Sequence, residues 1–437
     1  MKMKLQKSHF SRRAFFTLLL GVIFLMVSPL VVFAASSPIN LNLQESIQIA
    51  LENNIGFKIA ESTVDVSQAQ VKEVEGAKKL NMKLKGGILQ MSETLDEEDV
   101  AAGDYSNLFD LAPLAPVISI SASKIIYSGG KIKSLIDQAE ANKQISLNDL
   151  EKEKQAIIYK VTEAYYQVLQ TEGIKRVSAQ AVKQMQAHLE TSEALLQEGM
   201  IAPIDLNQIK SQLSNLEHNL IKAENSYELA MYNINSIMGI DLNAKWLLEN
   251  NLSYEPCAIK LEDALVQAGE NRSEIMNIAQ QKRIMEEMVD VAKSNRKPQV
   301  VFNAESGITG WQAMIVAEYS LLDGGVNKAK IEQAEIKLAQ VAQSEKQVRQ
   351  LVEFEVRSAY LNMKEAEKLI KVAEEGIQNS QESFRIAQVK YNEGIATNTE
   401  VIDAQSTLIE AETNFLNALY DYNINRSALI KAMGAGS

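Results

Sequence analysis

The sequence is poor in the residues that cross-links, metal sites and helix breaks require. Cys257 is the only cysteine among 437 residues, which excludes an intrachain disulfide, a CxxC redox pair and a cysteine-rich metal site. There are three histidines and seven prolines, and aromatic residues make up only 6%. Hydrophobic residues nevertheless reach 46%, and Ala, Leu, Ile, Gln, Glu and Lys dominate long tracts, as is typical of extended helices and coiled coils. The chain is therefore predicted to be mainly α-helical.

Basic residues gather at the N-terminus, where five of them precede an apolar run over residues 14–33: Lys2, Lys4, Lys7, Arg12 and Arg13. The run ends next to Ala34, which predicts that residues 1–34 are a secretory signal peptide cleaved after Ala34. An uncleaved anchor is the alternative, because about 20 apolar residues could just span a bilayer.

The remainder of the chain is acidic. Removal of residues 1–34 takes away five positive charges and no negative one, so the formal net charge changes from −12 to −17. Nucleic acid is therefore not expected as a partner, because phosphate binding needs clustered Lys and Arg. An exported, acidic chain without disulfides suits a bacterial envelope.

The sequence contains an internal duplication, which is sought before any single motif. The stretch LNLQESIQIALENN (41–54) matches IKLEDALVQAGENR (259–272) at an offset of 218, and later pairs such as Gly199 with Gly394 match at 195. The 23-residue difference falls in a loop, residues 91–115, that is rich in acids and has no basic residue. We therefore expect a first repeat at 35–240, a linker at 241–258 and a second repeat at 259–437.

The placement of proline predicts where the helices lie, because proline inside a helix costs about 3 kcal/mol. No proline falls within residues 130–202, within 204–255 or after 298. We expect unbroken helices at 131–198 and 326–393, roughly 100 Å long each, and shorter ones at 205–238 and 400–433. Gly199 and Gly394 would let each long helix fold back on the shorter one as a helical hairpin. Apolar residues recur along both long helices at three- and four-residue spacing: Val161, Tyr165, Val168, Val356, Tyr360 and Met363.

Each repeat also contains a segment in which the apolar period changes from 3.6 to 2. Residues 297–325 predict two strands around Gly307 and Gly310, and residues 81–89 and 116–127 predict two more. Strands of 9 to 11 residues with one apolar face suit a membrane β-barrel, but the pattern alone leaves a soluble sheet equally open. Four strands cannot close a barrel and open edges are not tolerated in lipid, so a membrane sheet would need two chains with eight strands or three with twelve.

The opening motif, the strand pairs ending in Gly-Gly, the EVRSAYLNM helix and the YNEGI turn together resemble the TolC-like outer-membrane efflux channel family, across essentially the whole mature chain. The resemblance implies a homotrimer in which each chain gives four strands to a 12-stranded β-barrel in the outer membrane. Its long antiparallel coiled-coil helices would form an α-barrel through the periplasm. The implied partners are a periplasmic adaptor (membrane fusion) protein and an inner-membrane transporter. The implied function is passive export of small molecules or proteins in tripartite efflux or type I secretion, without catalysis.

The resemblance also implies roles for residues at the second hairpin. Glu400 and Asp403 match acidic rings at the periplasmic entrance, and their spacing of three places both on one helical face. A solvated helix face is the alternative. Tyr391 and Asp205 match positions that latch the closed entrance, but Ala396 stands where a well-known member has arginine, so the latch is incomplete here.

Further residues are assigned by the resemblance or by their type. The turns that would contact the adaptor contain Glu198, Gly199, Met200, Ile201, Glu393, Gly394, Ile395 and Ala396. The aromatic residues that could lie at a membrane interface are Trp311, Tyr319 and Tyr127. His188 and His218 lie on separate predicted helices, and no Ser-His-Asp set, phosphate loop or zinc spacing is found, so catalysis, a metal site and a cofactor are not expected. The alternative function is a periplasmic or surface coiled-coil structural or adaptor protein.

Overall fold

The computed structural model describes residues 40–89, 115–249, 252–307 and 310–435. The expected signal peptide and residues 91–114 of the acidic loop lie outside these ranges. The described residues form two compact units. In one, β1 (Asn40–Leu41) pairs in parallel with β4 (Leu247–Leu248). The other contains the remaining helices and strands.

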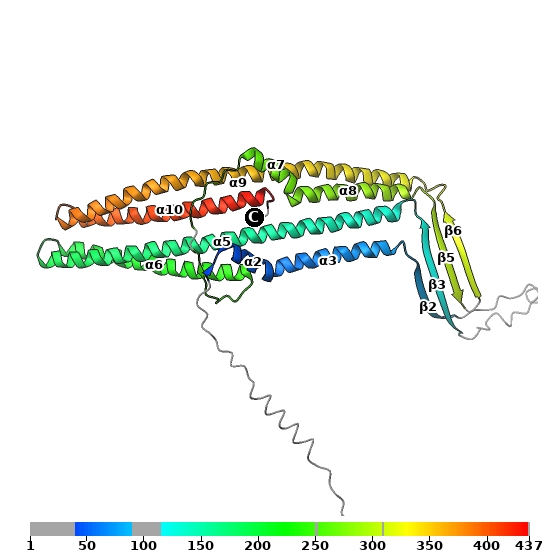
Figure 1. Cartoon of the computed structure of the whole chain (residues 1–437), viewed down its shortest axis with the longest axis horizontal. Helices are drawn as coiled ribbons and strands as arrows, with labels where there is room; N and C mark the ends of the chain where they lie inside the picture. Colours follow the sequence, from blue (N-terminus) through cyan, green and yellow to red (C-terminus); the bar gives the residue numbers. More distant parts are fainter. Residues whose placement is uncertain (1–39, 90–114, 250–251, 308–309, 436–437) are drawn as a thin grey trace, which may run out of the picture. The chain divides into compact units, whose positions relative to one another are not determined.

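Two very long helices dominate the larger unit (Figure 1). α5 (Lys131–Gln197) and α9 (Val326–Asn392) have 67 residues each, which confirms the prediction from the proline-free segments to within one residue. The other helices are α2 (Leu43–Asn53), α3 (Ile55–Gly76), α6 (Pro203–Met238), α7 (Leu261–Asn271), α8 (Ser273–Ser294) and α10 (Asn398–Ala432).

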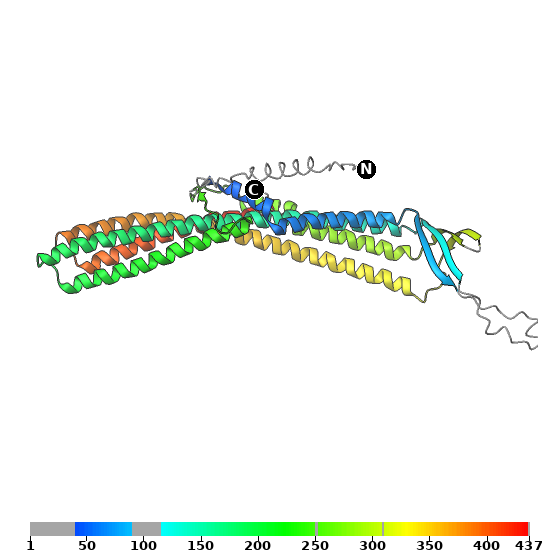
Figure 2. The same ribbon diagram turned by 90° about the horizontal axis from the view of Figure 1, so that it is seen from below.

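The long helices are held by hairpin partners and by lateral neighbours. α5 packs on α6, and α9 packs on α10, so the two predicted helical hairpins are confirmed (Figures 1 and 2). α5 also contacts α3, α8 and α10, and α8 contacts α9. Five of the six apolar positions predicted from periodicity are buried at 0 to 1% exposure: Val161, Tyr165, Val168, Val356 and Met363.

The two repeats close on themselves through equivalent contacts. The side-chain amide of Asn54, between α2 and α3, donates to the carbonyl of Ile237 at 3.4 Å. In the second repeat, the guanidinium of Arg272, between α7 and α8, donates to the carbonyl of Ala432 at 3.2 Å. In both repeats the contact joins the start of the repeat to the end of its last helix. The two copies of the duplicated sequence therefore make the same type of hydrogen bond at equivalent positions.

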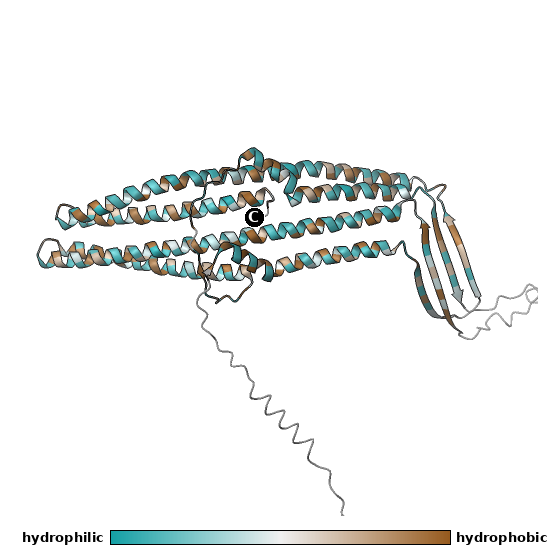
Figure 3. Cartoon of the chain, viewed as in Figure 1, coloured by the Kyte–Doolittle hydropathy of each residue, from teal (hydrophilic) through white to brown (hydrophobic). Residues whose placement is uncertain are grey.

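The strands of the two repeats form one antiparallel sheet in the order β2-β3-β5-β6. They are β2 (Asn81–Leu89), β3 (Ala115–Tyr127), β5 (Gln299–Gly307) and β6 (Gly310–Glu318), close to the predicted ranges. The pairings Phe302 with Ile315 and Glu305 with Gln312 keep apolar and polar residues on opposite faces. Figure 3 shows the resulting mixture of hydropathy along the strands.

The apolar face of the sheet is uncovered. Its large side chains are 47 to 80% exposed: Met82, Leu84, Ile88, Ile118, Ile120, Tyr127, Trp311 and Ile315. Nothing in the described part of this chain packs over these residues, although they form a continuous patch. Among the described residues, no helix combines the length and the apolar character needed to cross a membrane.

Candidate functional site

The first hairpin turns at residues 198–202, here called the first tip. Gly199 has φ +78°, which favours glycine, and the Met200 N–H donates to the carbonyl of Leu195 at 2.9 Å. This is the Schellman pattern, in which a left-handed residue lets the next N–H satisfy a carbonyl of the last helical turn. The first tip is thus a defined turn.

The second hairpin turns in the same way at residues 393–397, the second tip. Gly394 has φ +70°, and the Ile395 N–H donates to the carbonyl of Lys390 at 2.8 Å. Met200 and Ile395 occupy equivalent positions in the repeats and are 62% and 76% exposed. Each tip therefore presents one large apolar side chain to its surroundings.

The acid that follows each tip has a structural role. One carboxylate oxygen of Glu400 accepts from the Thr397 N–H at 3.1 Å and from the Thr397 hydroxyl at 3.0 Å, while the Glu400 N–H donates to that hydroxyl at 3.4 Å. This is a capping box, which satisfies the free N–H groups at the start of α10. Asp205, the equivalent acid, accepts from the Ala202 N–H at 3.2 Å at the start of α6. The hydrogen bonds from the Thr397 N–H and then its hydroxyl lower the pKa of Glu400.

Glu400 and Asp403 lie on the exposed side of α10. Both side chains are exposed, whereas Val401 and Gln405 on the other side of the helix are 1% and 2% exposed. The side chain of Asp403 has no capping role, and only its backbone carbonyl accepts, from the Thr407 hydroxyl at 2.9 Å. Both carboxylates therefore lie at the surface of this chain, that of Glu400 held by Thr397.

Tyr391 joins the second hairpin to the first. Its side chain is 4% exposed, and its hydroxyl lies 2.9 Å from the Ser192 hydroxyl on α5. Asp205, the other residue assigned to the latch, uses its carboxylate at the start of α6. Ala396 packs beside Tyr391 in a small apolar cluster. The inter-hairpin contact at this level is thus a neutral hydrogen bond.

A second buried contact between the hairpins involves His188, which sequence reasoning placed on a helix but gave no role. Its Nε2 lies 2.9 Å from the side-chain oxygen of Asn398, and its ring lies 4.7 Å from that of Tyr391. The Asn398 amide donates in turn to the carbonyl of Asp205 at 3.3 Å, which leaves its oxygen to accept from the imidazole. Burial lowers the pKa of His188, and the hydrogen bond to Asn398 opposes part of that shift.

The same polar contact line continues away from the tips. The amide of Gln405 donates to the carbonyl of Ala181 at 3.0 Å, and that of Gln170 donates to the side chain of Asn417 at 2.8 Å. We call this line between α5 and the second hairpin the hairpin seam: Ser192–Tyr391, His188–Asn398, Ala181–Gln405 and Gln170–Asn417. Each of its contacts involves at least one polar side chain, and apolar side chains such as Leu195 and Ile402 pack beside them.

The three predicted interface aromatics lie near the two ends of the sheet. Trp311 is at the β5–β6 turn and is 80% exposed. Tyr127 ends β3 and Tyr319 follows β6 directly, at 47% and 56% exposure. The β-bulge between Ile125 and Tyr127 places Tyr127 opposite Val300, on the apolar face.

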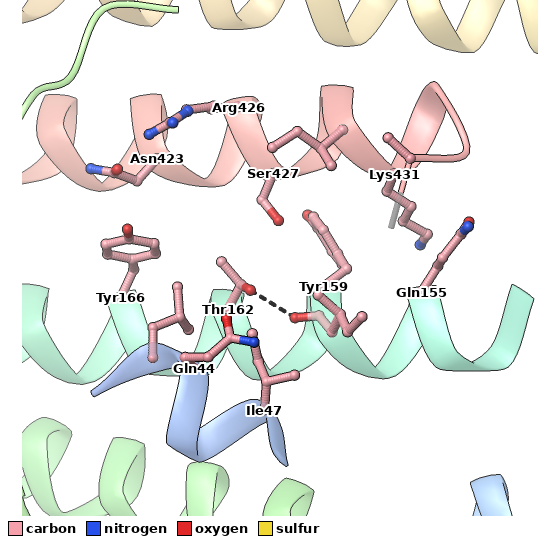
Figure 4. A pocket seen from close by; sticks show the side chains of 14 residues that line it. Gln44, Ile47, Gln155, Tyr159, Thr162, Tyr166, Asn423, Arg426, Ser427 and Lys431 are labelled. Carbon is pink, nitrogen blue, oxygen red and sulfur yellow. Dashed lines mark hydrogen bonds between the residues drawn. The ribbon is translucent and has the colours of Figure 1, made fainter. Parts of the chain in front are cut away.

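A pocket between α2, α5 and α10 is lined by several polar side chains (Figure 4). Its cations are engaged, because the Lys431 Nζ lies 4.7 Å from the centre of the Tyr159 ring and Arg426 lies 3.3 Å from Glu255. Within the described ranges, no three His, Cys, Asp or Glu side chains gather in a way that could hold a metal ion.

Comparison with known proteins agrees with this architecture. The family model described as outer membrane efflux protein matches residues 46–240 and 264–435. The outer membrane protein TolC of Escherichia coli (strain K12) is 20% identical over 344 residues, which are 72% of this chain and 69% of TolC.

Solved structures show the same fold. A membrane protein from Pseudomonas aeruginosa superposes with a TM-score of 0.78 at 16% identity, over 92% of both chains. CusC, whose structures concern folding and transmembrane channel formation, superposes with a TM-score of 0.77 at 16% identity, over 91% of this chain and 93% of CusC. Since the family model matches most of the sequence in two blocks, one in each repeat, the chain belongs to the outer membrane efflux protein family.

Proposed function

We propose that this outer-membrane efflux protein is the exit duct of a tripartite efflux or type I secretion system. Three copies would form a pore through which small molecules or proteins leave the periplasm passively. The observation that supports this most directly is the sheet, which has one large uncovered apolar face and two open edges. Lipid would cover the face, and neighbouring copies would pair with the edges.

The strand order is compatible with ring closure. β2 and β6 are the edge strands, and they run in opposite directions because each neighbouring pair in the sheet is antiparallel. β6 of one copy can therefore pair with β2 of the next in the antiparallel manner of outer-membrane barrels. Three four-stranded sheets would supply twelve strands, and no unpaired edge would remain in the lipid.

The long helices also support association. α9 exposes large apolar side chains at Leu351, Phe354 and Leu361, which are 56%, 68% and 63% exposed. A 67-residue helix with such a stripe is stabilised when another helix covers it. We propose that a helix of the neighbouring copy covers this apolar stripe. Helices packed in this way around the ring would extend the barrel below the membrane as an α-helical sheath.

The periplasmic entrance is assigned to the second tip. Glu400 and Asp403 from three copies would bring six carboxylates together, where like charges raise one another's pKa values and titrate as a coupled set. Such rings attract cations and bind divalent metal ions. Tyr391 and Asp205 lie next to the second and the first tip, in the last turn of α9 and the first turn of α6.

The tips would contact the periplasmic adaptor that connects this protein to an inner-membrane transporter. The exposed apolar pair Met200 and Ile395 supports this, because large apolar side chains at turn apices are otherwise unfavourable in water. Ile201 beside Met200 is partly buried, and the remaining tip residues are charged, small or glycine. The chain itself would perform no chemistry.

The alternative is a periplasmic or surface coiled-coil structural or adaptor protein. Carbonate washing of membranes distinguishes the two, since a barrel stays in the pellet. The deciding experiment is extraction in detergent, followed by mass measurement and recording in a planar bilayer. A trimer with stepwise conductance is expected, whereas a monomer without conductance would contradict the duct.

A further inference from the structure

The polar face of the sheet carries charge in a defined place. The strand register puts Lys83, Ser121, Glu305 and Gln312 side by side in one row across β2, β3, β5 and β6. Lys85 follows Lys83 on the same face, since side chains two residues apart on a strand point the same way. These side chains line a shallow hollow together with Asn81. This row of the face is therefore hydrophilic across all four strands.

The polar face would not contact lipid, because the opposite face of the sheet is the apolar one. Leu84, Ile118 and Ile315 are 72%, 63% and 67% exposed on that opposite face, and only one of the two faces can turn outward in a membrane barrel. Lys83 and Lys85 then face the water-filled interior. This step rests on the proposed function.

The charges on the polar face do not balance at this level. The Lys85 Nζ lies 3.9 Å from Glu305, whose carboxylate also accepts from the Ser119 hydroxyl at 3.3 Å. No carboxylate of the described residues lies within 4.0 Å of the Lys83 Nζ. Among the described residues of these two rows, each chain thus contributes one excess positive charge, and the lysines stand on the edge strand where two copies would meet. Glu318, another carboxylate on this face, lies six residues from Gln312 along β6.

We propose that Lys83 and Lys85 form a belt inside the β-barrel that binds multiply charged oxyanions, such as polyphosphates or polycarboxylates, and so favours anionic cargo at the outer end of the duct. The serine hydroxyls and the Gln312 amide of the same rows can donate hydrogen bonds to such a ligand. The belt has the opposite sign to the acidic entrance at the second tip, from which a long helix separates it.

The charge of the anion decides how strongly the belt attracts it. The attraction scales with the charge of the ion, so a polyvalent anion senses the belt much more strongly than chloride does. Charges farther apart than about 8 Å are largely screened at physiological ionic strength. The acids of the second tip, roughly 100 Å away along α9, therefore cannot cancel the belt.

The test is the block of single-channel current by inorganic tripolyphosphate added on the barrel side of a planar bilayer. Replacing both lysines (Lys83→Gln with Lys85→Gln) should raise the half-blocking concentration at least about threefold, because both attractive charges are lost from a confined pore. Replacing both by arginine should preserve the block. Glu305→Gln should lower the half-blocking concentration, because it removes the one neutralising carboxylate.

Lys124→Gln is the matched control. Lys124 pairs with Phe302, on the apolar face of the same sheet, so its replacement removes one positive charge per chain from the sheet without changing the interior. Equal half-blocking concentrations for wild type and the double glutamine variant would overturn the belt while leaving the duct intact. Absence of any channel in the wild-type protein would instead refute the duct, and the belt with it.

Discussion

The imidazole of His188 lies 2.9 Å from the side-chain oxygen of Asn398, with both residues buried, at 7% and 3% exposure, where the first hairpin meets the second. Asn398 is the first residue of α10, only a few residues from the acids at the second tip. A titratable group thus sits inside the contact that must loosen if the second hairpin moves against the first.

We predict that the hairpin seam weakens as the pH falls below the usual histidine pKa of about 6.5. Burial lowers the pKa of His188 when the two hairpins are packed together. At a pH between the lowered and the usual pKa, the separated hairpins therefore bind more protons than the packed ones, so the stability of the contact decreases as the pH decreases. The contribution of neutral His188 to the stability of the hairpin seam is complete above about pH 6.5. It is lost as the pH decreases toward the lowered pKa of the buried imidazole. Hydrogen exchange of residues 181–192 at several pH values measures it.

His188→Gln keeps a hydrogen-bond donor but cannot titrate, so its exchange should depend less on pH than that of the wild type. His218→Gln is the matched control, because His218 is exposed on α6. The same pH slope in the wild type and in His188→Gln would contradict the prediction.

The helices and strands were predictable because their signals are local. Proline-free segments delimited α5 and α9, and the glycines Gly307 and Gly310 marked the β5–β6 turn. Alternation along the strands also gave the correct faces, since the register pairs Phe302 with Ile315.

The hairpin seam was not predictable, since it depends on how α5 lies against α9 and α10. Residues far apart in sequence, such as Ser192 and Tyr391, meet only when the lateral offset of the hairpins is known. The capping role of Glu400 did have a signal, because Thr397 three residues before it forms the capping-box pattern. Interpreting that acid only as a pore residue overlooked its local function.

We predict that Gly434→Ala destabilises the chain by at least about 1–2 kcal/mol. Gly434 has φ +69°, and a Cβ there would lie 2.8 Å from backbone atoms of Asn271. Thermal unfolding in detergent measures the change. Gly269→Ala is the control, since its site in α7 is open and alanine should stabilise the helix by about 0.5–1 kcal/mol; equal effects of the two changes would argue against the close approach.

We predict that arginine is tolerated on one face of β6 and not on the other. Ile315→Arg places a charge on the apolar face, where lipid contact would cost about 2–4 kcal/mol near the bilayer centre. Met314→Arg, the neighbouring change on the polar face, should cost much less. Heat-resistant trimer recovered from membranes measures both.

Both side chains are well exposed in the single chain, at 67% for Ile315 and 47% for Met314. A sheet with water on both faces would therefore tolerate the two arginines about equally, and that outcome would exclude the barrel.

We predict that the cap and the charge of Glu400 can be separated. Glu400→Gln retains the capping box, because glutamine also serves at this position, but it removes the charge from the entrance. Glu400→Ala loses both, and the lost cap should lower the stability by about 0.5–2 kcal/mol. Asp403→Asn removes only charge, because its side chain caps nothing. Divalent-cation block from the periplasmic side should therefore weaken in all three variants, while only Glu400→Ala should unfold earlier.

Asp205→Asn is the matched control for this series. It stands at the equivalent position of the first repeat, and asparagine can still accept from the Ala202 N–H. If the second tip alone forms the entrance, this variant should keep both the block and the stability of the wild type. Weaker block in Asp205→Asn, with no change in Glu400→Gln, would assign the ring to the first hairpin instead, because both acids stand three residues after the start of the cap and accept from the N–H of the residue that precedes their helix.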